Sequence, residues 1–141
     1  MTLHLDDIST ILARHAGRPG ALLPILHDVQ HALGYVPADA IPVIAEALNL
    51  SRAEVHGTVS FYHDFRSAPA TRPVVKLCRA EACQARGVDA LAPLFEQDER
   101  ITLEAVYCLG LCAIGPAAMI GTRVVARLDE ASAARLLDEV A

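Results

Sequence analysis

The four cysteines of this 141-residue chain stand in two close pairs, and this spacing constrains its fold more than any other feature. Four residues separate Cys78 from Cys83, three separate Cys108 from Cys112, and 24 residues lie between the two pairs. Because a reducing compartment keeps ordinary thiols from forming disulfides, cysteines spaced in this way indicate a metal site.

Composition and charge exclude several functional classes. The net charge is −5, and the 12 Lys and Arg residues are scattered along the chain, so no nucleic-acid-binding surface is expected. Apolar stretches such as residues 40–50 are too short and too interrupted to cross a bilayer, so no membrane insertion is expected. The first residues lack the basic stretch and apolar run of a signal peptide, and the predicted location is therefore cytoplasmic.

The first half of the sequence predicts an N-terminal helical bundle over residues 1–68. Apolar residues recur every three or four positions between Leu22 and Leu33, and Gly34 follows them as a helix-stop signal. Ser51 and Glu54 have the spacing of an N-terminal capping box. The following segment, residues 67–73, has the Ser, Ala and Pro content of a linker, which places a domain boundary there.

The second half, residues 73–141, changes to short strands mixed with helices. Strands are predicted at residues 74–77, 101–107, 117–120 and 123–127, with helices at 88–97 and 130–140. Gly121 and Thr122 are typical of a tight hairpin turn between the last two strands. This order predicts an α/β fold in which a small thioredoxin-like domain follows the helical bundle.

The chemistry of the two cysteine pairs favours a 2Fe-2S cluster, which needs four thiolates, two on each iron. Each pair follows a predicted strand, and if these strands are parallel neighbours, both loops lie at the same end of the sheet. Gly110 and Gly115 are expected to adopt backbone angles that a side chain would disfavour. Partial exclusion of water from the cluster is expected from three apolar residues of the second loop: Leu109, Leu111 and Ile114.

Other interpretations of the cysteines stay open at this stage. A structural zinc site also uses four thiolates, although zinc sites usually contain a Cys-x-x-Cys pair and neither spacing here has that length. A zinc-stabilised adaptor is therefore the alternative from a different functional class. Disulfides or free thiols are a third possibility, whereas a thiol oxidoreductase is disfavoured because its Cys-x-x-Cys motif is absent.

Two further groups of residues are candidates for function. Arg79 is expected to be a solvated loop charge, with donation to a cluster sulfur as the alternative. An aromatic cluster is expected to serve either as core or as an interface anchor, and consists of Phe61, Tyr62 and Phe65. The sequence contains no Gly-x-Gly-x-x-Gly and no Walker loop, so no nucleotide pocket and no catalytic residue are expected.

The strings around the cysteines, together with an upstream region, resemble a known family. The strings are Cys78-Arg-Ala-Glu-Ala-Cys83 and Tyr107-Cys-Leu-Gly-Leu-Cys112, with Gly115-Pro116 after them. The upstream region includes Leu33-Gly-Tyr-Val-Pro37 and Val55-His-Gly-Thr-Val-Ser-Phe-Tyr-His63. From about residue 20 to 140, the chain resembles the thioredoxin-like 2Fe-2S ferredoxin family, the small iron-sulfur subunits found beside the NADH-oxidising flavoprotein of complex I.

This resemblance implies an electron-transfer subunit with one 2Fe-2S cluster on Cys78, Cys83, Cys108 and Cys112. It implies an oxidoreductase assembly in which a partner flavoprotein holds the FMN, the NAD site and a 4Fe-4S cluster. The N-terminal bundle, residues 1–68, is then expected to dock onto that flavoprotein. No substrate site is expected in this chain alone.

The finer sequence of the strings most resembles the gamma subunit of soluble NAD-dependent formate dehydrogenases. Cys83 is followed by Gln84-Ala85-Arg86-Gly87, whereas complex I relatives more often end this stretch in a Leu-Arg-Gly type triplet. The predicted assembly therefore includes a molybdenum- or tungsten-containing formate dehydrogenase subunit. The alternatives are the equivalent subunit of complex I, NADH:quinone oxidoreductase, or of a bidirectional NAD-linked hydrogenase.

Overall fold

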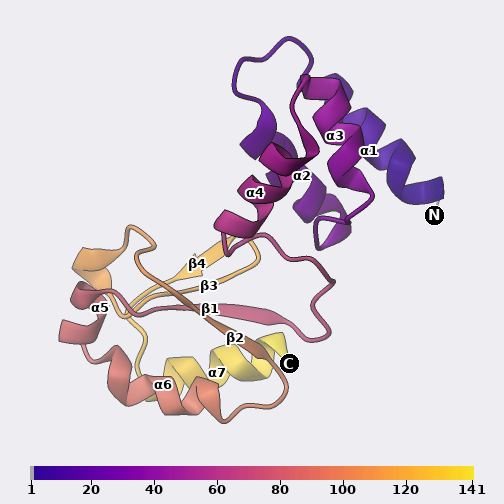
Figure 1. Ribbon diagram of the computed structural model, residues 1–141. Coiled ribbons are helices and arrows are strands. Elements are labelled where there is room, and N and C mark those ends of the chain that lie inside the picture. The colour runs from indigo at the N-terminus through magenta and orange to yellow at the C-terminus, as the bar shows by residue number, and fades with distance from the viewer. Residues whose placement is uncertain (1) are drawn as a thin grey trace. The chain divides into compact units, whose positions relative to one another are not determined.

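The computed structural model describes residues 2–141, with side chains from Asp6 onward, and divides them into two units. The division falls between Ala70 and Thr71, inside the segment 67–73. The first unit is helical and the second combines helices with a four-stranded sheet (Figure 1), so the predicted α/β class with a leading helical bundle is confirmed. Within residues 2–141, no helix combines the length and the hydrophobicity that crossing a bilayer requires.

The N-terminal unit is a bundle of amphipathic helices with a core of its own. Its helices are α1 (Thr2–Arg14), α2 (Leu22–Leu33), α3 (Ala40–Leu48) and α4 (Arg52–Phe61). The side chains that they bury completely include Ile8, Ile25, Leu26, Val29, Ile44 and Val55. Removing one such side chain from water contributes roughly 1.5–3 kcal/mol, so these apolar faces hold the bundle together.

Two predicted signals fix where helices of this unit end and begin. Gly34 follows α2 in the left-handed region at φ 82°, and its N–H donates to the carbonyl of Gln30. Ser51 starts α4 with the predicted capping box, in which its side chain accepts the N–H of Glu54 and the Glu54 carboxylate accepts the N–H of Ser51. The start of α4 is therefore set locally.

The C-terminal unit is built on a sheet with the strand order β2-β1-β3-β4. The strands are β1 (Val74–Cys78), β2 (Thr102–Val106), β3 (Ala118–Ile120) and β4 (Arg123–Val125). β1 and β2 are parallel, whereas β3 is antiparallel to both β1 and β4. Gly121, at φ 57°, makes the predicted tight turn between β3 and β4.

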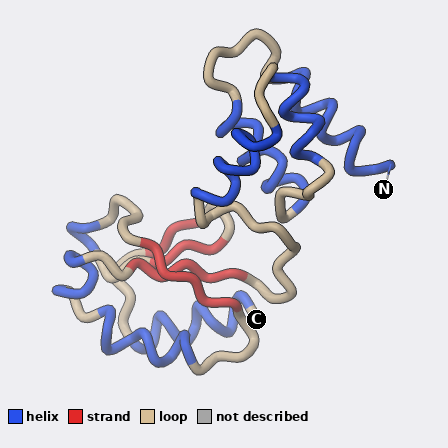
Figure 2. Tube along the Cα trace, viewed as in Figure 1, coloured by secondary structure: helices blue, strands red, loops and turns tan. Residues whose placement is uncertain are grey.

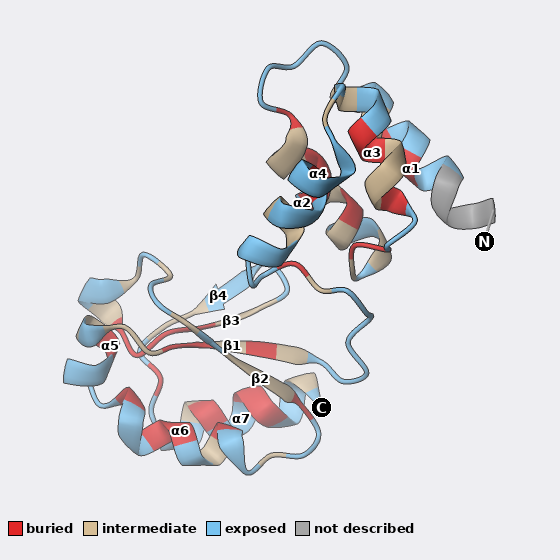
Figure 3. Ribbon diagram, viewed as in Figure 1, coloured by how far each residue is buried: buried red, intermediate tan, exposed pale blue. Residues whose placement is uncertain are grey.

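Two helices, α6 (Val88–Glu96) and α7 (Glu130–Val140), lie side by side along one face of this sheet (Figure 2). Their buried stretches, red in Figure 3, join the inward strand residues in the second core, which includes Val75, Leu77, Val88, Phe95, Ala133 and Leu137. The predicted order of elements lacked α5 (Glu81–Ala85) and the 3-10 turn η1 (Cys112–Ile114). Segments this short show no measurable hydrophobic period, which is why the sequence pattern missed them.

Candidate metal centre

Both cysteine pairs begin at the same edge of the sheet. β1 ends at Cys78, and its parallel neighbour β2 ends at Val106, directly opposite Cys78 and just before Cys108. The N–H of Arg79 donates to the carbonyl of Val106 at 2.8 Å, and the N–H of Cys78 donates to that of Ala117 at 2.9 Å. The prediction that parallel strands bring both loops to one end of the sheet is therefore confirmed.

The second cysteine of each pair lies in one of the short helical turns. Cys83 lies within α5, and Cys112 begins η1. Cys108 has φ 130°, a backbone conformation that costs a non-glycine residue of order 1–3 kcal/mol. Strain of this kind persists where the surrounding structure imposes it and is concentrated at functional sites.

The four sulfurs form two pairs in space as well as in sequence. The Sγ atoms of Cys108 and Cys112 lie 3.6 Å apart, and the thiols of Cys78 and Cys83 are hydrogen-bonded to each other. All four are free thiols. The first pair is buried and the second is exposed, so one side of the site is shielded by protein and the other is accessible from solvent.

The surroundings shift the pKa values of these thiols in different directions. Burial raises the pKa of Cys83, and its hydrogen bond with Cys78 adds to this effect. The pKa of Cys108 is lowered because the N–H of Gly110 donates to its Sγ at 3.3 Å. The hydrogen bond with Cys108 in turn raises the pKa of Cys112. Cys108 is therefore held closer than Cys83 or Cys112 to the thiolate form, which is the form that binds metals.

Two glycines beside the cysteines meet different physical needs. Gly110 has φ 77°, so the predicted conformation that disfavours a side chain is confirmed there. For Gly115 the same prediction is wrong, since its φ of −63° is open to any residue. Space favours glycine at this position instead, because a Cβ on Gly115 would lie 3.0 Å from Sγ of Cys83. A side chain here would therefore press on this sulfur.

The loop that carries the exposed pair is apolar and uncharged. No charged residue occurs between Glu104 and Arg123. Leu109 and Leu111 are half-buried and pack against the core of the C-terminal unit, and Ile114 is half-buried as well. Partial exclusion of water from a cluster by these three residues stays a prediction.

Arg79 does not behave as the predicted solvated charge. Its guanidinium forms ion pairs with Asp89 at 3.1 Å and with Glu96 at 3.4 Å, both on α6. These two ion pairs hold the side chain against α6. Its Nε is buried and has no hydrogen-bond partner among the described residues, so donation to a cluster sulfur stays a prediction.

Arg86 makes a contact that the sequence analysis missed. Its Nε–H donates to the carbonyl oxygen of Cys112 at 3.0 Å, across 26 positions of sequence. The contact joins the segment of the first cysteine pair to that of the second. A cation three residues after Cys83 was the only signal for it in the sequence.

A 2Fe-2S cluster fits this set of donors. The four sulfurs come as two pairs, one at the end of β1 and in α5 and one on the segment after β2. Two pairs match two irons with two thiolates each. The contacts of Gly110 with Cys108 and of Gly115 with Cys83 bring backbone close to the sulfurs, as Fe-S proteins require to set the potential of their clusters.

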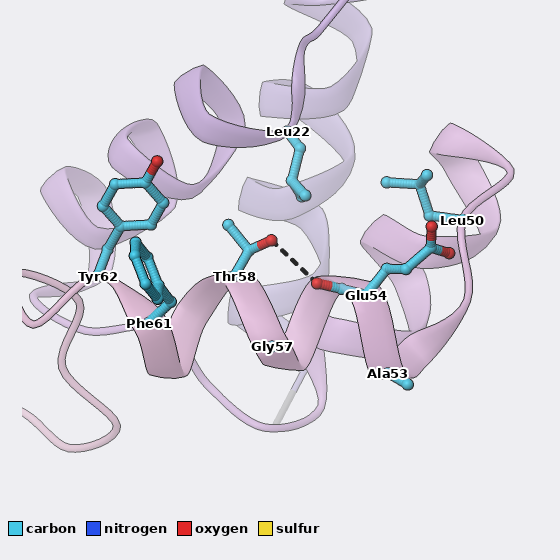
Figure 4. Close-up of a pocket in the computed structure, with 8 residues that line it drawn as sticks. All are labelled: Leu22, Leu50, Ala53, Glu54, Gly57, Thr58, Phe61 and Tyr62. Carbon is cyan, nitrogen blue, oxygen red and sulfur yellow. Dashed lines mark hydrogen bonds between the residues drawn. The ribbon is translucent and has the colours of Figure 1, made fainter.

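The N-terminal unit carries an open groove along α4 (Figure 4). This α4 groove has a volume of about 430 Å³ and is lined by Leu22, Leu50, Ala53, Glu54, Gly57, Thr58, Phe61 and Tyr62. The hydroxyl of Thr58 donates to the carbonyl of Glu54 at 2.9 Å, so it is satisfied within the helix. The lining that remains available is mainly apolar.

The aromatic cluster is divided between core and surface. Phe65 is 8% exposed and packs on the ring of His27 at 5.0 Å between centroids. Phe61 is 75% exposed and Tyr62 44%, and their rings meet edge to face at 5.2 Å. One member thus stabilises the bundle, while the other two leave a large apolar area in solvent.

Comparison with known proteins assigns the chain to a family. The family model for the thioredoxin-like 2Fe-2S ferredoxins matches residues 8–141. The chain belongs to this family. Membership confirms the resemblance that the two cysteine strings predict, and with it the thioredoxin-like ferredoxin fold of the C-terminal unit.

Several relatives of this ferredoxin are subunits of larger oxidoreductases. The NADP-reducing hydrogenase subunit HndA of Solidesulfovibrio fructosivorans is 27% identical, over 86% of this chain and 78% of its own length. A subunit of the NADH-quinone oxidoreductase of Rhizobium meliloti is 28% identical, over 94% of this chain and 86% of its own length. The NAD-reducing hydrogenase HoxS subunit alpha of Cupriavidus necator is 31% identical over 86% of this chain.

A solved structure is similar in fold as well as in sequence. The crystal structure of an NAD+-reducing NiFe hydrogenase in the H2-reduced state matches 85% of this chain with a TM-score of 0.68 and 30% identity. The match covers 22% of that hydrogenase chain, and the match to the HoxS alpha subunit likewise covers 22% of its length. This ferredoxin therefore corresponds to about a fifth of each of those larger chains.

Proposed function

We propose that this chain is an electron-transfer subunit that binds one 2Fe-2S cluster through Cys78, Cys83, Cys108 and Cys112. When bound, such a cluster accepts and releases one electron at a time. The chain itself supplies the four thiolates, the backbone contacts to the sulfurs and the apolar loop that limits water. Turnover of a substrate is left to the assembly in which the chain is a subunit.

One observation carries this proposal: two cysteine pairs lie at and after the ends of two parallel strands, one pair buried and the other exposed. The buried pair anchors the site within the fold. The exposed pair brings the site to the protein surface, where an electron can pass to or from a partner over a short distance. Family membership supports the same cluster type.

The zinc-stabilised adaptor is less well supported. Structural zinc sites usually contain a Cys-x-x-Cys pair, and neither spacing here has that length. A thiol oxidoreductase is likewise less well supported, because neither cysteine spacing has the Cys-x-x-Cys length.

We infer that the partner is an NAD(P)-linked flavoprotein in an assembly of the NADH-quinone oxidoreductase or NAD-reducing hydrogenase type. The relatives described above support these assemblies. FMN, NAD and a 4Fe-4S cluster are expected on that partner. The formate dehydrogenase assembly, with its molybdenum or tungsten subunit, depends on the finer sequence of the two cysteine strings and of Pro116-Ala-Ala-Met119, and the relatives favour the other two types.

The α4 groove is the proposed docking face of the N-terminal unit. Phe61 and Tyr62 leave aromatic surface in solvent at its end, and aromatic side chains are enriched among the residues that dominate binding energy at interfaces. Docking of the unit onto the flavoprotein would cover them. A cytoplasmic location of the assembly stays a prediction.

Anaerobic purification of the full chain, followed by visible absorption and EPR spectroscopy, tests the proposed cofactor. The protein should be red-brown, lose colour on addition of dithionite, and give a rhombic EPR signal in the reduced state. A colourless protein with one equivalent of zinc would support the adaptor instead. A metal-free protein that reduces a protein disulfide would support the thiol oxidoreductase.

A further inference from the structure

We propose that Arg86 is a positioning residue for the iron-sulfur centre: it ties the two cysteine segments together, and its charge favours the reduced cluster. The inference rests on the proposed function, because it assumes that the four cysteines bind a cluster. It adds a residue that is neither a ligand nor part of the two cysteine strings.

The first part of the inference follows from where the Arg86 side chain lies. Arg86 ends α5, three residues after Cys83, and its Nε–H reaches the carbonyl oxygen of Cys112 at 3.0 Å. It also lies so close over Gly115 that a Cβ there would be 3.4 Å from the Arg86 Cδ. The side chain therefore spans the turn that carries Cys112.

The hydrogen bond from Arg86 holds the middle of the loop that carries Cys108 and Cys112, whereas two backbone hydrogen bonds hold the ends of that loop. The N–H of Arg79 holds the carbonyl of Val106 before the loop, and the N–H of Cys78 holds that of Ala117 after it. Arg86 instead holds the carbonyl of Cys112, an expected ligand. A hydrogen bond from a charged donor is about twice as strong as a neutral one, so its loss should loosen this ligand.

The second part of the inference follows from the charge of Arg86. The surrounding loop, residues 105–122, has no charged side chain, and none of the ion pairs found among the described residues involves Arg86. A 2Fe-2S cluster on four thiolates is negatively charged and becomes more so on reduction. A cation beside the Cys112 carbonyl therefore stabilises the reduced state more than the oxidised state.

The test uses two variants of the full, cluster-loaded chain. Arg86→Met removes both the charge and the donor, whereas Arg86→Gln removes the charge but keeps an N–H at the position of the arginine Nε–H. The reduction potential is measured by EPR-monitored redox titration, and cluster stability is measured as the rate of iron transfer to a chelator. Arg123→Gln is the matched control, because it removes the same charge from β4, where Arg123 pairs with Glu139 at 2.8 Å.

Both variants should lower the ratio of reduced to oxidised cluster at a fixed potential by roughly tenfold, which is about 59 mV for one electron, because the charge is lost. Arg86→Met should also release iron about fivefold faster than the wild type, because the hydrogen bond to Cys112 is lost. Arg86→Gln should release iron at a rate within about twofold of the wild type, because its N–H can still donate to Cys112. Arg123→Gln should change neither quantity.

The inference is overturned if Arg86→Met has the potential and the iron-release rate of the wild type, or if Arg123→Gln shifts the potential equally. If Arg86→Met does not load a cluster, Arg86→Gln decides alone: a ratio of reduced to oxidised cluster that is roughly tenfold lower supports the inference, and an unchanged ratio overturns it. A wild-type protein without iron and sulfide would instead defeat the proposed function. The two failures are therefore distinguishable.

Discussion

The backbone of Gly115 lies tightly against the sulfur of Cys83: a Cβ on Gly115 would be 3.0 Å from the Cys83 Sγ. Cys83 belongs to the first cysteine pair and Gly115 follows the second. Their contact therefore packs the two ligand segments directly against each other.

Gly115→Ala should lower both cluster content and stability. The added methyl group overpacks a buried contact, and such changes typically cost about 1–3 kcal/mol. Iron content per chain and the free energy of unfolding in urea measure the two effects. Gly57→Ala is the control, because its Cβ meets nothing within 4 Å in the interior of α4, and it should raise stability by roughly 0.5–1 kcal/mol. A Gly115→Ala protein with wild-type iron content and stability would contradict the steric argument.

The variants Phe61→Ala and Phe65→Ala should distinguish a role in docking from a role in the stability of the fold. Phe65 is buried, so its loss should lower the free energy of unfolding by about 3–5 kcal/mol. Phe61 is mostly exposed, so its loss should change stability by less than about 0.5 kcal/mol. If the α4 groove docks the flavoprotein, Phe61→Ala should nevertheless weaken co-purification of the co-expressed subunit by roughly tenfold in affinity. Unchanged affinity with Phe61→Ala would exclude the groove as the docking face.

Asp129, the N-terminal cap of α7, should make the free energy of unfolding depend on pH. The hydroxyl of Ser132 and then its N–H, which donates at 2.7 Å, hold the pKa of Asp129 below its usual range. A lowered folded-state pKa contributes stability above the ordinary aspartate value, about 3.9, and this contribution is lost as the pH falls through the lowered pKa.

Urea unfolding of the wild type and of Asp129→Asn at pH 7 and at pH 3 measures this effect. Asn keeps a capping oxygen but cannot titrate, so the difference between the two proteins should be larger at pH 7 than at pH 3. A difference that is the same at both pH values would show that the Asp129 charge does not contribute.

Much of the fold was predictable because its signals are local. The capping box of Ser51 and Glu54, the left-handed Gly34 and the hairpin at Gly121 each depend on a few neighbouring residues. The meeting of the two cysteine loops was predictable too, since strands that are parallel neighbours end at the same edge of a sheet.

What the sequence did not predict depends on distances between segments far apart in the chain. Glycine is favoured at position 115 because Cys83 lies against it in the fold, and the sequence alone does not show this contact. The sequence analysis instead predicted an unusual backbone angle at Gly115, and that prediction is wrong. The hydrogen bond from Arg86 to Cys112 and the ion pairs of Arg79 with α6 are long-range in the same sense. No periodicity or spacing encodes such contacts.

The most direct test of the central claim is a count of iron and acid-labile sulfide in the anaerobically purified full chain and in its four single Cys→Ser variants. The account predicts a stoichiometry of two irons and two sulfides per chain for the wild type, and a lost or spectroscopically altered centre in every variant. A wild-type chain without iron and sulfide, or a variant at any of the four cysteines that keeps an unchanged, fully loaded centre, would contradict it.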